Sequence, residues 1–242
     1  MKVFLCSDSW ISFFTAVFYA FFETDSILSS NKNLHLTLDS IVKEIDGNFE
    51  KAQRIRNAIN KYDTEALSDV MFALRSCDES KEQKIFNYIK RLINTKSPIK
   101  NAFNLPEVVE FNEILYKITG EIHRLKGLLR FMEIENGVLY APYSPDNDVT
   151  ENLMPHFAAR FKCEKFIIHD VKRKTAGIYN GYEWVICEIG ETEIFLSENE
   201  KFFEILWKKY YNSVNIKERP HEKQMKKSMP VRYWKYLPEK KL

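Results

Sequence analysis

The sequence predicts an α+β fold: a mostly antiparallel sheet with a helical middle region, in a single compact domain over residues 1–242. Two observations support this prediction. Apolar residues recur at helical spacing through about residues 46–126, and strand-like runs flank that region on both sides. Hydrophobic residues make up 45% and aromatic residues 14% of the chain, which is sufficient for a core and unlike the composition of disorder.

The chain opens with a predicted strand and helix. "KVFLC" (2–6) is typical of a short buried strand, and "SDS" supplies helix-capping residues before the apolar "WISFFTAVFYAFF" (10–22). This stretch is shorter than the ~20 apolar residues of a membrane span. It also lacks the basic flank of a signal peptide, since Asp8 precedes it. We therefore expect a buried helix, no membrane contact and a cytoplasmic location. Alternation in "NLHLTLDSI" (33–41) predicts a second strand.

Four helices are predicted in the middle of the chain. Apolar residues lie three and four apart in residues 48–62, 63–76 and 80–96, which indicates three of them. The fourth helix covers residues 106–127. Pro106 suits its first turn, and Gly127 suits its end.

The apolar period changes after residue 127. Strand-like runs enclose Asn136 and Gly137, a dipeptide typical of two-residue hairpin turns. Residues 146–161 predict a helix that Pro155 is expected to kink or restart. "EKFIIHDV", "KTAGIYN" and "EWVICEIG" predict three more strands, and residues 197–214 predict the last long helix.

Positive charge is concentrated at the C-terminal end. Residues 201–242 carry 12 Lys and Arg against 4 Asp and Glu, whereas residues 121–200 carry 9 against 14. A polyanion would therefore bind near that end. In "KKSMPVRYWKYLPEKKL" (226–242), aromatic residues alternate with basic ones, a pattern that can stack bases and neutralise phosphates. The favoured alternative is that Tyr233 and Trp234 dock residues 213–242 on the domain, while Arg232 and Lys235 stay near the surface.

Catalytic motifs of the familiar kinds are absent. The sequence has no GxGxxG, Walker-type, HExxH or GxSxG motif, and its four cysteines form no CxxC pair. His123, Lys126 and Arg130 lie near a predicted helix end, where they could grip a phosphate or simply form a solvated face. Lys172 and Arg173 follow a strand and offer a second phosphate-contacting turn, or ordinary hairpin decoration.

A divalent metal is the alternative to the expectation of no cofactor. His123, His156, His169 and Asp170 have the ligand atoms for zinc, iron or manganese. Their spacing is irregular, however, and a histidine on an apolar face is more often a hydrogen-bonded core residue. We therefore expect that the four side chains do not all converge.

Several long stretches resemble an uncharacterised family assigned to DNA metabolism. They include "HRLKGLLRFMEIENGVLYAPYSPDNDV", "MPHFAARF", "FIIHDVKRKTAGIY" and "QMKKSMPVRYWKYLPE". Members of that family are encoded beside a radical-SAM protein of DNA modification or repair, and some carry the same domain fused to a uracil-DNA-glycosylase-like domain. The resemblance implies a DNA context and a radical-SAM partner, and it implies no particular reaction.

Two functions remain open at this point. The first is a DNA-binding or adaptor subunit that serves the radical-SAM partner and contacts DNA, single-stranded or damaged. Its expected contacts are Lys126, Arg130, Lys172, Arg173, Arg219, Lys226, Lys227, Arg232 and Lys235. The second is an enzyme acting on nucleic acid, in which His123, His169 and Asp170 would perform acid–base or metal-assisted chemistry.

Overall fold

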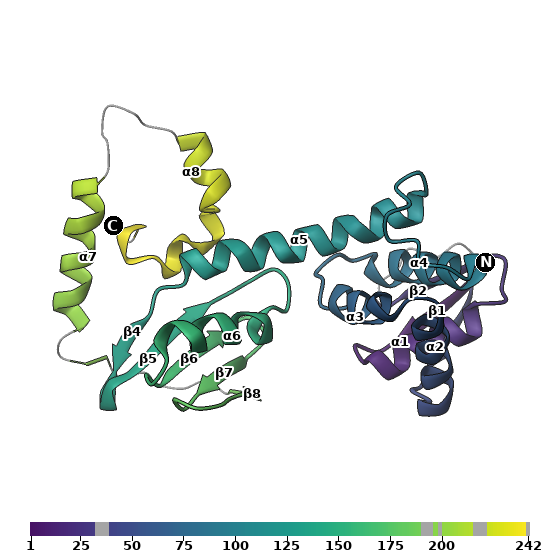
Figure 1. Ribbon diagram of the computed structural model, residues 1–242, viewed down its shortest axis with the longest axis horizontal. Helices are drawn as coiled ribbons and strands as arrows, with labels where there is room; N and C mark the ends of the chain where they lie inside the picture. Colours follow the sequence, from purple (N-terminus) through teal and green to yellow (C-terminus); the bar gives the residue numbers. More distant parts are fainter. Residues whose placement is uncertain (32–38, 190–195, 198–199, 215–221, 241–242) are drawn as a thin grey trace. The chain divides into compact units, whose positions relative to one another are not determined.

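The structure is a computed structural model that describes residues 1–31, 39–189, 196–197, 200–214 and 222–240. The chain divides into two compact units, Met1–Thr119 and Gly120–Leu242, called here the first and the second unit (Figure 1). The α+β class is confirmed, and the expectation of one domain over residues 1–242 stays a prediction. Within the described ranges, no helix is both long enough and apolar enough to cross a membrane.

The first unit combines a small sheet with several helices. Its strands are β1 (Lys2–Cys6), β2 (Ser26–Ser29) and β3 (Ile41–Ile45). Its helices are α1 (Trp10–Ala20), α2 (Phe49–Tyr62), α3 (Thr64–Ala73), α4 (Lys81–Thr95) and the first part of α5 (Pro106–Leu128). Side chains from the strands and from the helices are buried in its core, and Tyr88 of α4 stacks on Phe111 of α5 with ring centroids 4.0 Å apart.

The sheet of the first unit is entirely parallel, in the order β2-β1-β3. This corrects the expectation of a mostly antiparallel sheet. Parallel neighbours need a long crossover, and α1 supplies one because it lies between β1 and β2 in the chain. The strand expected over residues 33–41 is also displaced, since β3 begins at Ile41, and residues 32–38 lie outside the described residues.

Side-chain caps explain where α1, α2 and α3 begin. The Ser9 hydroxyl accepts a hydrogen bond from the backbone N–H of Ile11 at 3.3 Å, which starts α1. The Asn48 side chain accepts from the N–H of Lys51 at 3.0 Å, which starts α2. Asp63 ends α2 and caps α3. Such caps partner the N–H groups that a first helical turn leaves unbonded.

In its described residues, the second unit has a five-stranded sheet, four helical segments and three short 3₁₀ turns. Its strands are β4 (Met132–Ile134), β5 (Val138–Tyr143), β6 (Phe166–Asp170), β7 (Thr175–Tyr179) and β8 (Trp184–Glu188). The helical segments are the end of α5, α6 (Thr150–Phe161), α7 (Glu200–Val214) and α8 (Glu222–Ser228). The 3₁₀ turns are η1 (Glu135–Gly137), η2 (Val231–Tyr236) and η3 (Pro238–Lys240).

This second sheet is mixed, in the order β4-β5-β6-β7-β8. Only β5 and β6 run parallel, because α6 lies between them and makes the crossover that a parallel pair needs. The expected hairpin around Asn136 is confirmed, but its turn is longer than two residues. Ile134 pairs with Val138, so η1 forms the turn, and Gly137 takes a φ of +70° that suits glycine.

Helix α6 covers one face of this sheet (Figure 1). A Cβ atom added at Gly177 on β7 would lie 2.2 Å from the Met154 sulfur, so glycine permits the close approach. Of the two effects considered for Pro155, a kink or a restart, the restart does not occur, because α6 runs as one helix through the proline. Burial of Leu153, Met154 and Phe157 against the sheet offsets the hydrogen bond that proline removes.

Candidate nucleic-acid interface

The C-terminal segment, defined here as residues 222–240, is anchored in the second unit by Tyr233. This side chain is 2% exposed, and its hydroxyl donates to the carboxylate of Glu121 on α5. Glu121 also accepts from the backbone N–H groups of Asp146 and Asn147, both at 2.9 Å. Burial opposes ionisation, yet these donors outweigh it and hold the pKa of Glu121 below its ordinary value. Trp234, which was also expected to be buried, is only half-buried.

Two of the arginines expected to contact DNA hold the loop between β5 and α6. Arg173 forms an ion pair with the fully buried Asp170 at 2.8 Å and donates to the backbone carbonyls of Pro145 and Asp146. Arg232 forms an ion pair with the carboxylate of Asp146 at 2.8 Å. Both guanidinium charges are therefore engaged by carboxylates, and a phosphate would have to compete with those carboxylates for them.

A third arginine, Arg130, fastens η3 to the end of α5. Its guanidinium lies 2.8 Å from one oxygen of Glu239, and the indole N–H of Trp207 donates to the other oxygen at 2.8 Å. The Glu239 side chain has no solvent exposure. Burial alone would raise the pKa of Glu239, but the hydrogen bonds from Arg130 and Trp207 contribute to holding it below its ordinary value.

The lysines expected to contact DNA remain accessible. The exposed members are Lys172, Lys226, Lys227 and Lys235. Lys126 is half-buried at the end of α5. Lys226 makes only a surface ion pair with Glu222, at 3.3 Å. Arg219 lies outside the described residues.

The residues of the alternative metal site are not brought together. In the parts of the chain that the structure describes, no three His, Cys, Asp or Glu side chains are placed to hold one metal ion. His169 and Asp170 are consecutive residues of β6, so their side chains point to opposite faces of the sheet. Two of the three catalytic residues proposed from the sequence, His169 and Asp170, therefore lie in two different environments.

Each histidine of that set has surroundings of its own. His169 is half-buried, and its Nδ1 lies 2.7 Å from the Tyr140 hydroxyl. Burial lowers the pKa of His169, although the charge of Asp170 opposes the shift. His156 packs its ring on Phe157, and burial followed by nearby positive charge lowers its pKa. His123 is exposed on α5.

Sequence reasoning missed the acidic partners of these arginines. Glu121, Asp146 and Glu239 receive the hydrogen bonds that fix the C-terminal segment. The sequence contains a signal for one of them, because Glu239 is an isolated acid within the basic "PEKKL". An acid retained inside a positive segment is a candidate partner for an arginine elsewhere, but only the fold reveals which one.

An aromatic groove of about 860 Å³ lies beside this anchor. One wall is α7, and the other is formed by the end of α5, β4, β5 and α6, with Pro238 of η3 at the groove as well. Its aromatic lining consists of Phe131, Phe157, Phe161, Phe203, Trp207 and Tyr210. Ser197, near the start of α7, is hydrogen-bonded to β4 of the opposite wall. Its backbone N–H donates to the Glu133 carbonyl at 3.0 Å.

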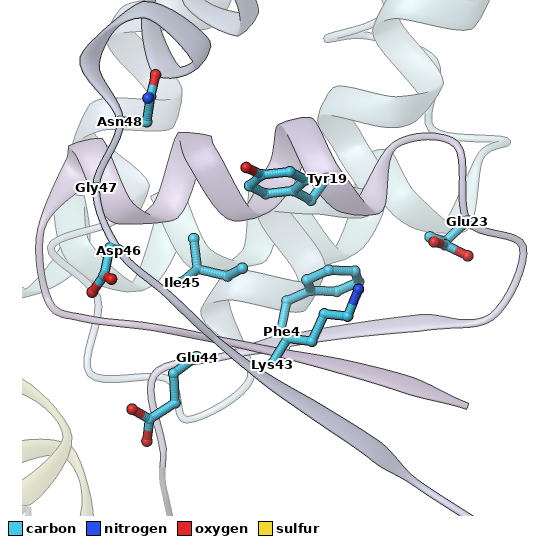
Figure 2. Close-up of a pocket in the computed structure, with 9 residues that line it drawn as sticks. All are labelled: Phe4, Tyr19, Glu23, Lys43, Glu44, Ile45, Asp46, Gly47 and Asn48. Carbon is cyan, nitrogen blue, oxygen red and sulfur yellow. The ribbon is translucent and has the colours of Figure 1, made fainter.

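The first unit contains a different pocket, of about 570 Å³. Figure 2 shows Phe4 and Lys43 on neighbouring strands beneath Tyr19 of α1. The charged residues that line it are one cation and three acids: Lys43, Glu23, Glu44 and Asp46. None of the cations that the sequence predicts as nucleic-acid contacts lines this pocket. The second unit is therefore the better candidate for a nucleic-acid interface.

The fold and these contacts define an α+β protein whose second unit combines a basic C-terminal segment with an aromatic groove. Residues 79–239 match the family described as a domain of unknown function, DUF4130, and the chain belongs to this family. The match begins just before α4 and includes nearly all of the second unit. No curated protein matches the chain.

Proposed function

We propose that the protein binds nucleic acid through exposed lysines of its C-terminal segment, as a DNA-binding or adaptor subunit in DNA repair or modification. The observation that carries this proposal is a difference between the arginines and the lysines in what they contact. Arg130, Arg173 and Arg232 are engaged by carboxylates, whereas Lys226, Lys227 and Lys235 lie exposed. Exposed lysines can meet phosphates without breaking a buried contact. The DNA context and the radical-SAM partner rest on the family resemblance of the sequence.

The proposal is tested by replacing Lys226, Lys227 and Lys235 together with alanine. Each phosphate contact contributes about 0.9 to the slope of log affinity against log salt on duplex DNA, or about 0.7 on a single strand. Losing three contacts should therefore lower that slope by about 3 or about 2, respectively. Fluorescence anisotropy of labelled DNA over a salt series measures the slope.

The matched control replaces three exposed lysines of the first unit, Lys43, Lys61 and Lys117, with alanine. It removes the same net charge, so a long-range charge effect would change both variants alike. Equal slopes for the wild type and the C-terminal variant would refute the proposed interface.

The radical-SAM partner is tested by co-expression of the two proteins and size-exclusion chromatography. The first unit is the expected contact, because its charges nearly balance and it is rich in aromatic residues. Separate elution at micromolar concentration would count against a stable complex.

An enzyme acting on nucleic acid is the second candidate, and one contact favours it. The 2.7 Å hydrogen bond between Tyr140 and His169 orients an imidazole whose lowered pKa keeps it neutral and able to accept a proton. Incubating labelled single- and double-stranded DNA with the wild type and with His169→Ala tests this reading. A product formed by the wild type and lost only in that variant, with His123→Ala as control, would favour the enzyme.

A further inference from the structure

One apolar face of α7 is partly exposed in the groove. Leu206, Trp207 and Tyr210 follow the spacing of one helix face and all line the groove. They are nevertheless 44%, 36% and 57% exposed, respectively. A helix face that completed a core would be buried, so this stripe has the character of a binding surface.

The groove offers flat rings together with the guanidinium group of Arg160, because Arg130, its other arginine, is engaged by Glu239. Phe131 and Phe161 line the wall opposite α7, with their ring centroids 4.8 Å apart. Arg160, which is exposed, lies over the Phe161 ring at 5.8 Å. Aromatic faces stack on bases, and a neighbouring guanidinium can bind the attached phosphate. This combination favours a nucleotide over a purely apolar ligand.

Carboxylates in the groove narrow the choice of ligand. Glu204 is paired with Lys208 at 3.0 Å, and Glu200 accepts a hydrogen bond from the N–H of Glu133 at 2.7 Å. Such acids repel a phosphate backbone that runs along the groove floor. They can accept hydrogen bonds from the amino groups on the edge of a base. A duplex hides both the faces and the pairing edges of its bases, whereas an unpaired base presents them.

We infer that this groove binds unpaired bases of a single-stranded or locally opened nucleic acid. The bases stack on Trp207 and Tyr210, and the phosphates lie toward Arg160 and the exposed lysines of the C-terminal segment. The volume of about 860 Å³ falls within the ~300–1,000 Å³ of pockets that enclose small ligands. The inference rests on the proposed nucleic-acid binding and adds a selectivity for unpaired strands.

The test compares Tyr210→Ala with Tyr182→Ala in the full-length protein. Tyr210 lines the groove, while Tyr182 is 94% exposed in the turn before β8 and lies outside the groove. Fluorescence anisotropy would measure affinity for a labelled single strand and for its duplex. Stacking on one aromatic ring supports about a 5- to 150-fold gain in affinity. We expect Tyr210→Ala to lose that factor on the single strand alone, and Tyr182→Ala to lose nothing.

The possible results separate this inference from the proposed function. Equal single-strand affinities for the wild type and Tyr210→Ala, or an equal loss on single strand and duplex, would overturn the groove assignment. If the triple lysine variant still lost affinity in that case, the proposed function would stand without the groove. Thermal melting of Tyr210→Ala checks the fold, and alanine is well tolerated in a helix. Binding of neither nucleic acid by the wild type would overturn both.

Discussion

The two halves of the C-terminal segment carry the same net charge and have opposite environments. Helix α8 has no buried residue, and its lysines extend into solvent. The stretch from η2 to η3 buries Tyr233 and Leu237, which are 2% and 1% exposed. Basic residues occur in both halves, so charge does not distinguish them. Docking is decided by the aromatic and apolar side chains that lie between the charges.

The ion pairs of the two halves differ in the same way. Glu222 and Lys226 on α8 are 75% and 51% exposed, and their charged atoms are 3.3 Å apart. Glu239 and Arg130 are 0% and 20% exposed at 2.8 Å. Water solvates and screens the first pair, whereas the second has lost most of its water and depends on its partner. Stability should therefore depend on η2 and η3, and hardly at all on α8.

The largest expected effect is that of Tyr233→Ala. Truncating a buried aromatic side chain costs about 3–5 kcal/mol, and Glu121 would lose one hydrogen-bond donor in addition. Chemical denaturation followed by tryptophan fluorescence measures the change. Tyr182→Ala is the control, because that ring is 94% exposed. Similar losses for both tyrosines would remove the distinction between the two halves.

Arg130→Ala should have the next largest effect. Removing one partner of a buried ion pair costs about 3–5 kcal/mol when the pair is fully buried. We expect about 2–3 kcal/mol here, because Arg130 is 20% exposed and Trp207 still donates to Glu239. The same denaturation experiment measures this change. Arg130→Lys should recover part of the loss, and full stability of Arg130→Ala would show that η3 is not fastened by this pair.

The sequence predicts several helices and strands well because their periods are clear. Helix α5 and strands β7 and β8 begin and end within two residues of the ranges expected for them, whereas α8 was not expected. Whether two strands run parallel or antiparallel is harder to predict from the sequence, because it depends on the segment that connects them. The run after β1 was recognised as a helix, yet its role as a parallel crossover follows only when β2, a four-residue strand, is seen beside β1.

The sequence predicts which types of residue form the candidate site, but it does not predict which of them contact one another. The basic character of residues 226–242 and the docking of Tyr233 follow from the sequence. The sequence does not show that Arg232 is engaged by a carboxylate while Lys235 is exposed, because this depends on Asp146 lying 2.8 Å from Arg232 in the fold. The groove depends on residues from α5, α6 and α7 that only the fold brings together.

Acidification should lower the stability contributed by η2 and η3, by less than Tyr233→Ala or Arg130→Ala does. The pKa of both Glu121 and Glu239 is lowered in the folded protein from an ordinary value of 4.5. Each group therefore contributes stability that is present above pH 4.5 and is lost as the pH falls through its folded pKa. The melting temperature should fall on acidification from pH 5, and Glu239→Gln should show a shallower fall.

Glu200 is the control for this pH series. Burial raises the pKa of Glu200, so its contribution is lost as the pH rises and has the opposite sign. Glu200→Gln should therefore leave the acid-induced fall in melting temperature in place. A Glu239→Gln variant with the pH dependence of the wild type would exclude this carboxylate as the source.

The smallest expected effect is that of Lys226→Ala, and it completes the comparison. A solvent-exposed pair at i, i+4 on a helix contributes only about 0.3–0.5 kcal/mol, and alanine's helix propensity offsets part of its loss. Lys226→Ala should thus unfold at nearly the wild-type denaturant concentration, while Arg130→Ala does not. Repeating both measurements at high salt sharpens the test, because salt screens the exposed pair and leaves the buried pair nearly unchanged. A Lys226→Ala loss as large as that of Arg130→Ala would mean that α8 is docked too, and its lysines would then be poor candidates for phosphate contacts.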